Sequence, residues 1–189
     1  MLSEDKMIVA LNDLSDEATL RGAITLLQTN HAPKHLTATH TRPADRGYGA
    51  AFFMKRKMIT TQITKVVWGK PQVRNVRTPS HEFGDYEGID RTDEFRIVSH
   101  IGKCDFGAIV DNHAKTSNSF IFFTEIPKPY VGFDWIRDKS LPIEGGYLGA
   151  VIAKRRRNWK ILTAFPCGYP YYSRMGAKVI HRRGGSWSL

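Results

Sequence analysis

Two short segments of this chain place a histidine close to a lysine, a combination suited to proton transfer beside a phosphate. His113 is followed by Lys115 and two hydroxyl residues, and His100 precedes a lysine by three positions. Histidine can give or take a proton near neutral pH, and ammonium or hydroxyl groups can stabilise a charged phosphate. Because the two histidines flank the apolar segment 106–110, we expect only one to reach a given phosphate, and we favour His113.

Two other histidine-containing segments are weaker candidates. The first holds His31, His35 and His40, but the His-x-Thr element at His35 has no second matching copy. The second runs from His81 to Glu87 and combines one histidine with three acids. One histidine without ligand spacing indicates a solvated loop rather than a metal site. A surface or structural role is the alternative for every histidine in the chain.

Positive charge is concentrated near the C-terminus. The 189 residues carry a formal net charge of +10; no acid follows Glu144, whereas nine of the 28 Lys and Arg residues do. Tryptophans, tyrosines and a phenylalanine are interleaved with these cations. Cations can hold phosphates while bases stack on aromatic rings, so we expect a nucleic-acid partner, RNA rather than DNA. The expected binding residues are Arg155, Arg156, Arg157, Lys160, Tyr171, Tyr172, Arg174 and Lys178. A solvated basic face is the alternative.

Several functional classes are disfavoured. Cys104 and Cys167 are too few for a disulfide framework and lack metal-ligand spacing. Phosphate-loop, dinucleotide, zinc-protease and GxSxG motifs are absent from the sequence, so we expect no metal and no cofactor. The sequence has no apolar run of about 20 residues, and the acidic start is unlike a signal peptide. We therefore expect a cytoplasmic protein without a membrane partner.

The elements that would position these residues change in type along the chain. Ser3 and Ser15 can cap helices over 4–11 and 16–29, and a loop is expected over 31–49. Residues rich in β-branched and aromatic side chains predict strands over 50–54, 58–68, 94–100, 106–110 and 119–126. The Pro- and Gly-containing stretch 71–91 reads as irregular.

A last pair of strands, Tyr147–Ala153 and Asn158–Phe165, forms the clearest predicted hairpin, joined by a basic turn at Arg155 and Arg156. Helices followed by strands indicate an α+β fold, with N-terminal helices and an antiparallel sheet that ends in a hairpin. We expect one domain over residues 1–183. It would be helical over 1–30 and mainly β over 50–166, with a basic segment over 167–183 and a flexible tail over 184–189.

The segment Trp159–Pro166, with the sequence WKILTAFP, resembles the terminal strand of the barnase, EndoU, colicin and RelE-like ribonuclease superfamily. Many toxin members end in a similar strand with a Thr-Ala-aromatic-Pro signature. The resemblance implies metal-independent RNA cleavage, in which the ribose 2′-hydroxyl attacks its own phosphodiester. It places Thr163 at the active-site threonine, whereas Phe165 stands where EndoU-like toxins have a tyrosine.

These observations lead to three hypotheses. The first is a metal-independent endoribonuclease, of the type used as a toxin or a phage or mobile-element effector. Its catalytic residues would be His113, Lys115 and Thr163, with His100 as a further candidate. The second is a non-enzymatic regulator or inhibitor that binds nucleic acid through the basic and aromatic C-terminal surface. The third is a basic module that docks on an acidic protein. Under the first hypothesis, an immunity protein would be a further partner.

Overall fold

The computed structural model describes residues 2–24, 50–53, 58–79, 89–112, 118–134, 141–143, 146–168 and 175–189. Within these ranges the helices are α1 (Glu4–Asp13), α2 (Glu17–Ile24), α4 (Arg91–Ser99) and the short η3 (His100–Gly102). The strands are β1 (Ala50–Phe53), β2 (Met58–Val67), β3 (Lys70–Pro79), β4 (Phe106–Asp111), β5 (Ser119–Glu125), β6 (Val131–Asp134), β7 (Leu141–Ile143), β8 (Tyr147–Arg155), β9 (Asn158–Cys167), β10 (Lys178–Arg183) and β11 (Ser186–Ser188). The fold is α+β, which confirms the predicted class.

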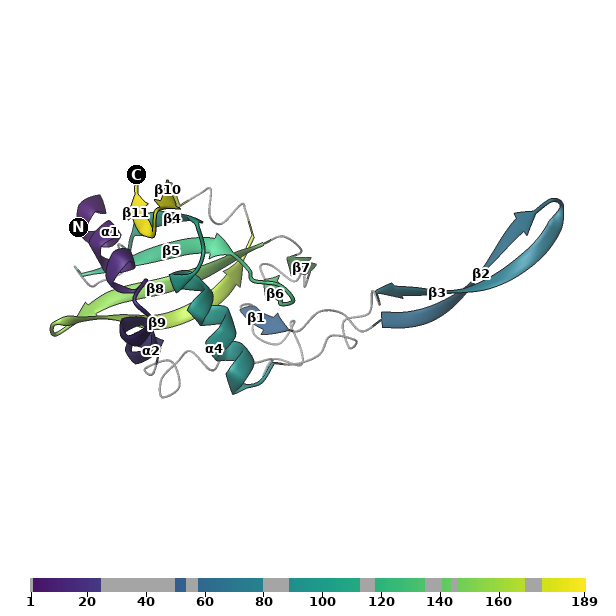
Figure 1. Ribbon diagram of the computed structural model, residues 1–189, viewed down its shortest axis with the longest axis horizontal. Coiled ribbons are helices and arrows are strands. Elements are labelled where there is room, and N and C mark those ends of the chain that lie inside the picture. Colours follow the sequence, from purple (N-terminus) through teal and green to yellow (C-terminus); the bar gives the residue numbers. More distant parts are fainter. Residues whose placement is uncertain are drawn as a thin grey trace.

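The centre of the molecule is a six-stranded antiparallel sheet with the strand order β11-β10-β4-β5-β8-β9. Helices α1, α2 and α4 lie over one face of this sheet (Figure 1). The main core fills the space between them, with Phe120 and Phe122 of β5 fully buried against helix residues such as Leu11 and Ile97. A smaller apolar cluster, which includes Ile121, lies on the opposite face. The alternation of side chains along β5 therefore supplies both layers.

Helix α4 replaces the strand predicted over 94–100, and that prediction is wrong. The Asp90 carboxylate accepts from the Asp93 N–H at 2.8 Å, and the Asp93 carboxylate accepts from the Asp90 N–H at 3.0 Å. This reciprocal capping box satisfies N–H groups that the first helical turn leaves unpaired. It favours a helix although Phe95, Ile97 and Val98 are residues typical of strands.

The predicted hairpin is confirmed as β8 and β9, and its tip is the turn formed by Arg156 and Arg157. The register shifts between Val151 and Ile152, so β9 holds one extra residue there, as in a β-bulge. Near the other end of the pair, Gly149 lies under Phe165. A side chain at Gly149 would come within 2.7 Å of that ring.

The end of the chain is ordered rather than a flexible tail. Residues Ser186–Ser188 form β11, which pairs with β10, and the Trp187 side chain is buried against Phe122 with ring centroids 5.4 Å apart. The backbone N–H of Trp187 also donates to the Asn12 carboxamide oxygen at 2.7 Å. Burial of this indole outweighs the flexibility expected from the glycines before it.

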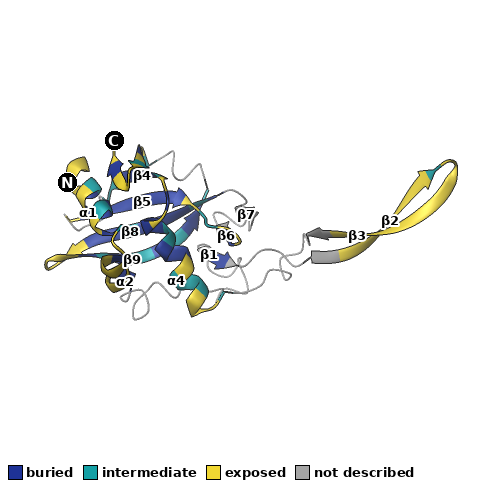
Figure 2. Ribbon diagram, viewed as in Figure 1, coloured by how far each residue is buried: buried dark blue, intermediate teal, exposed yellow. Residues whose placement is uncertain are grey.

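Strands β2 and β3 form a long hairpin, the arm, that projects from the body of the molecule (Figure 1). Of residues 60–77, all are exposed except the half-buried Val67 and Val76 (Figure 2). Residues 71–79, predicted to be irregular, are therefore strand. Their β-branched residues, valine and threonine, pair with β2. The two prolines lie near the two ends of β3, where an edge strand tolerates them.

A second, three-stranded sheet has the order β1-β6-β7. It lies near the end of β9, since a side chain at Gly132 of β6 would clash with the Pro166 ring. None of the helices in the described ranges is long and apolar enough to cross a membrane.

Candidate nucleic-acid interface

The tip of the β8–β9 hairpin carries three consecutive arginines, Arg155, Arg156 and Arg157, which we call the arginine turn. All three are exposed, and across the described ranges none of them makes an ion pair or a side-chain hydrogen bond. Arg156 has a φ angle of 56°, a left-handed conformation that favours glycine in a hairpin turn. The turn therefore presents to solvent three guanidinium groups that have no partner in the part of the chain that the structure describes.

An aromatic residue and a lysine next to the arginine turn connect the turn to the core. The ring of Trp159 is nearly buried and packs edge-on against Phe120, with centroids 5.9 Å apart. The ammonium of Lys154 lies 5.7 Å from the centre of the Trp159 ring, within range of a cation–π interaction. The first residues of β9 are thus fixed to the core, which holds the turn in place.

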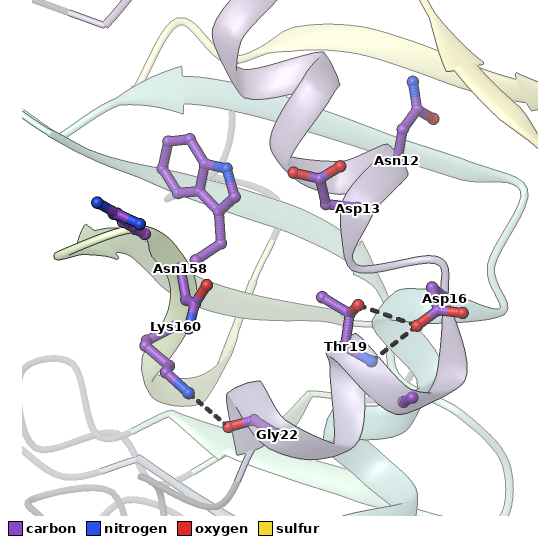
Figure 3. Close-up of a pocket in the computed structure, with 10 residues that line it drawn as sticks. Asn12, Asp13, Asp16, Thr19, Gly22, Asn158 and Lys160 are labelled. Atoms are coloured by element: carbon purple, nitrogen blue, oxygen red, sulfur yellow. Dashed lines mark hydrogen bonds between the residues drawn. The ribbon is translucent and has the colours of Figure 1, made fainter.

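A cavity of about 590 Å³ lies beside the arginine turn, between β9 and the first two helices (Figure 3). Its lining residues are Asn12, Asp13, Asp16, Ala18, Thr19, Gly22, Arg157, Asn158, Trp159 and Lys160. Cationic donors thus face carboxylate and amide acceptors across one space. Such a lining can take a polar ligand that carries both an anionic group and hydrogen-bond donors.

One acid that lines this cavity, Asp16, accepts hydrogen bonds at the start of α2. The Asp16 carboxylate accepts from the Thr19 N–H and hydroxyl, each at 2.9 Å (Figure 3), the arrangement of a helix N-cap. These hydrogen bonds lower the pKa of Asp16 below its ordinary value. Lys160 donates to the Gly22 carbonyl at 2.8 Å. Lys160, a predicted nucleic-acid contact, therefore anchors the end of α2 while its side chain lines the cavity.

His113, Lys115, Tyr171, Tyr172 and Arg174 lie outside the described residues. The residues that flank the first two are described. Asn112 donates its N–H to the Ser119 carbonyl at 3.1 Å, and the Lys154 N–H donates to the Asn118 carbonyl at 2.9 Å. The connection between β4 and β5 therefore leaves and re-enters the main sheet at the same end as the arginine turn.

His100 lies at the opposite end of the sheet. It follows α4, and its pKa is lowered by burial, with a smaller opposing effect from Glu125 at the end of β5 and a smaller lowering effect from Lys103. Glu125 and Ser119 are at opposite ends of β5, about 20 Å apart at the usual rise per residue. The structure therefore does not bring His100 together with the arginine turn.

Thr163 is on the face of the sheet away from the helices. It pairs with Val151, whose side chain packs against the smaller apolar cluster, and paired residues share a face. Its hydroxyl oxygen is buried and has no hydrogen-bond partner in the described part of the chain. Thr163 and His100 are thus not neighbours, and the threonine hydroxyl does not reach solvent.

Other cations of the C-terminal region have roles within the fold. Lys178 forms an ion pair with Glu4 at 2.6 Å. The Arg182 guanidinium donates to the Gly102 carbonyl at 2.7 Å and to the Gly185 carbonyl at 3.1 Å. Charge along the sequence could not separate these residues from the exposed arginines, because the partners are 80 or more positions away in two of these contacts.

The strand predicted over 58–68 corresponds to β2, but the hairpin that β2 forms with β3 was not predicted. Its signal was present: Trp68 and Gly69 form a two-residue turn between strands rich in Val, Ile and Thr. Elsewhere, no group of three or more His, Cys, Asp or Glu side chains in the described ranges is arranged to hold a metal ion.

We compared the chain with protein-family models, with curated proteins and with solved structures. None of the three comparisons gives a match.

Proposed function

We propose that this protein binds nucleic acid, and that the arginine turn is a principal phosphate contact. The observation that carries the proposal is the state of Arg155, Arg156 and Arg157, which are exposed and have no partner in the described ranges. An arginine presents several donors that match phosphate oxygens. Three of them on one tip form a compact site for a polyanion.

The backbone conformation of Arg156 supports a role for this residue in binding a partner outside the fold. A non-glycine residue at positive φ costs on the order of 1 kcal/mol, and glycine would avoid this cost. Because the Arg156 side chain makes no hydrogen bond, ion pair or ring contact within the described ranges, the fold gains no such compensating interaction from it. Strained backbone conformations cluster at functional sites.

The test is nucleic-acid binding by a variant in which all three arginines become alanine. For a single-stranded RNA, the loss of three phosphate contacts should make the slope of log affinity against log salt shallower by about 2. Alanine at the exposed cations Lys6, Lys103 and Arg183 is the matched control, and it should change the slope less. Equal slopes for the two triple variants would refute the role of the arginine turn.

A second candidate function is metal-independent RNA cleavage, and one observation favours it. The hydrogen bond from the Lys154 N–H to the Asn118 carbonyl places Asn118, three residues after Lys115 in the sequence, beside the arginine turn. Phosphate held by arginines near a histidine and a lysine suits transesterification by the 2′-hydroxyl.

Cleavage is tested by incubating the protein with labelled tRNA and a DNA of the same sequence in excess EDTA. Products from RNA alone, with 2′,3′-cyclic phosphate ends, would support the ribonuclease, and His113→Ala should then abolish cleavage while binding persists. Binding by the unmutated protein without any cleavage would leave the regulator or inhibitor role in its place.

A further inference from the structure

The arm has one sign of charge and no core of its own. Residues 58–79 include Lys65, Lys70, Arg74 and Arg77 but no Asp or Glu. All four cations are exposed and make no ion pair in the described ranges. Each strand has ten residues, so the arm extends about 33 Å. An isolated two-stranded hairpin is only marginally stable in water, and this one has apolar residues facing solvent, with Val66 67% and Val73 62% exposed.

Three of the cations follow one another along a single face of the arm. Starting at the tip, the cross-strand pairs on that face are Val67 with Lys70, Lys65 with Gln72, and Ile63 with Arg74. Side chains on one face recur every second residue, about 7 Å apart. Each of these three successive pairs therefore contributes one cation. Arg77, paired with Thr60, lies on the opposite face.

The tip of the arm holds the most exposed large apolar side chain among the described residues, Trp68, at 97%. Trp68 has a φ of 53° and Gly69 a φ of 74°. A two-residue turn of this kind favours Asn-Gly, and a bulky residue there is strained. Trp68 and Arg156 are the two non-glycine residues at positive φ in the described ranges, and both form hairpin tips.

We infer that the arm binds an unpaired stretch of nucleic acid, with Trp68 stacked on a base and Lys65, Lys70 and Arg74 in contact with the neighbouring phosphates. Every base has a face on which an indole can stack, but in a continuous duplex those faces are covered. A row of cations that leads to one exposed aromatic ring therefore matches a single strand or a loop. The inference deepens the proposed function, since it names the form of nucleic acid that is bound.

The decisive variant is Trp68→Asn. It introduces the residue that the turn favours, so the arm should fold at least as well, while the stacking surface is lost. We expect roughly tenfold weaker binding to a labelled single strand and little change for a blunt duplex. Trp68→Phe, which keeps an aromatic face, should retain most of the affinity. Quenching of tryptophan fluorescence on addition of the single strand should be reduced in Trp68→Asn.

The cationic face is tested by two single variants on the same strand. Arg74→Ala, on the face with three cations, should weaken binding and reduce its salt dependence more than Arg77→Ala on the opposite face. Parallel titrations with RNA and DNA strands of the same sequence show which of the two nucleic acids supplies the unpaired base. Either strand bound through the arm would support the inference.

Equal affinity of Trp68→Asn and the unmutated protein for the single strand would overturn the inference. The inference would also be overturned if Trp68→Asn changed the oligomeric mass of the protein without changing its affinity for the single strand, because the arm would then pair with a second copy of the chain. If only the arm variants lose binding, this inference stands and the proposed role of the arginine turn is refuted. If only the arginine-turn variant loses binding, the role of the arginine turn stands and this inference is refuted. If the unmutated protein does not bind nucleic acid, both are overturned.

Discussion

The Lys178 ammonium lies 2.6 Å from the Glu4 carboxylate, so a lysine of the basic C-terminal region is paired with an acid of the first helix. The contact joins β10 to α1 across 174 positions of sequence. It lies on the helix-covered side of the sheet, whereas the arginine turn is at the tip of β8 and β9. Local charge therefore overstates the number of cations available to a polyanion.

Lys178→Ala should leave nucleic-acid affinity nearly unchanged. Since both partners are about half exposed, the ion pair should contribute less than about 1 kcal/mol to the free energy of unfolding. A filter-binding titration and a thermal melt, each beside Arg157→Ala, measure the two quantities. A loss of affinity as large as that of Arg157→Ala would contradict the structural role of Lys178.

Thr163→Val should stabilise the fold, because it replaces a buried hydroxyl that has no partner in the described ranges with a methyl group of similar shape. Removal of this desolvated group should add about 1 kcal/mol, which corresponds to a rise of about 3 °C in the melting temperature. The same variant should bind RNA normally. A lower melting temperature would show that the hydroxyl is hydrogen-bonded.

Burial lowers the pKa of His100, so the folded state takes up its proton less readily than the unfolded chain. Stability from the neutral imidazole is present above about pH 6.5, the ordinary histidine value, and is lost as the pH falls towards the lowered pKa. The free energy of unfolding should therefore decrease between pH 7 and pH 5. His100→Gln should show a smaller decrease over this range, measured by urea unfolding, and identical pH profiles would contradict the assignment.

Burial raises the pKa of the Cys104 thiol to about 11, and Cys167 is buried as well. A thiol reacts as the thiolate, so neither cysteine should react with a thiol reagent at pH 8 while the protein is folded. Both should react after addition of denaturant. Rapid labelling of the native protein, located by mass spectrometry, would show that one of these sites opens without global unfolding.

Much of the fold could be predicted from local patterns. Helix α1 begins after Ser3 as predicted, although the Ser3 side chain makes no capping hydrogen bond in the described ranges. Helix α2 begins one residue later than predicted, because Asp16 rather than Ser15 accepts from the Thr19 N–H. The hairpin of β8 and β9 follows from two apolar runs joined by a basic turn. In each case the determining contacts are close in sequence.

The remaining elements depend on contacts that local patterns do not contain. Helix α4 is an exception, because its capping box joins Asp90 to Asp93 and is local, but the β-favouring residues that follow obscured it, and Ile97 is buried only in the fold. Strand β11 exists because Trp187 packs against Phe122, far away in sequence. The same applies to the site, since only the fold shows that Arg182 is hydrogen-bonded to Gly102 while Arg155 has no partner among the described residues.

The hydrogen bond from Trp187 to Asn12 brings β11 against α1, so the marked N- and C-terminal ends lie near each other on the body of the molecule, away from the arm (Figure 1). A tether attached at either end would therefore leave the tip of the arm facing free solution. Single molecules immobilised in this way could capture nucleic acid through Trp68 without interference from the surface. Joining the two ends with a short peptide should likewise be tolerated, and new ends could be opened elsewhere in the chain.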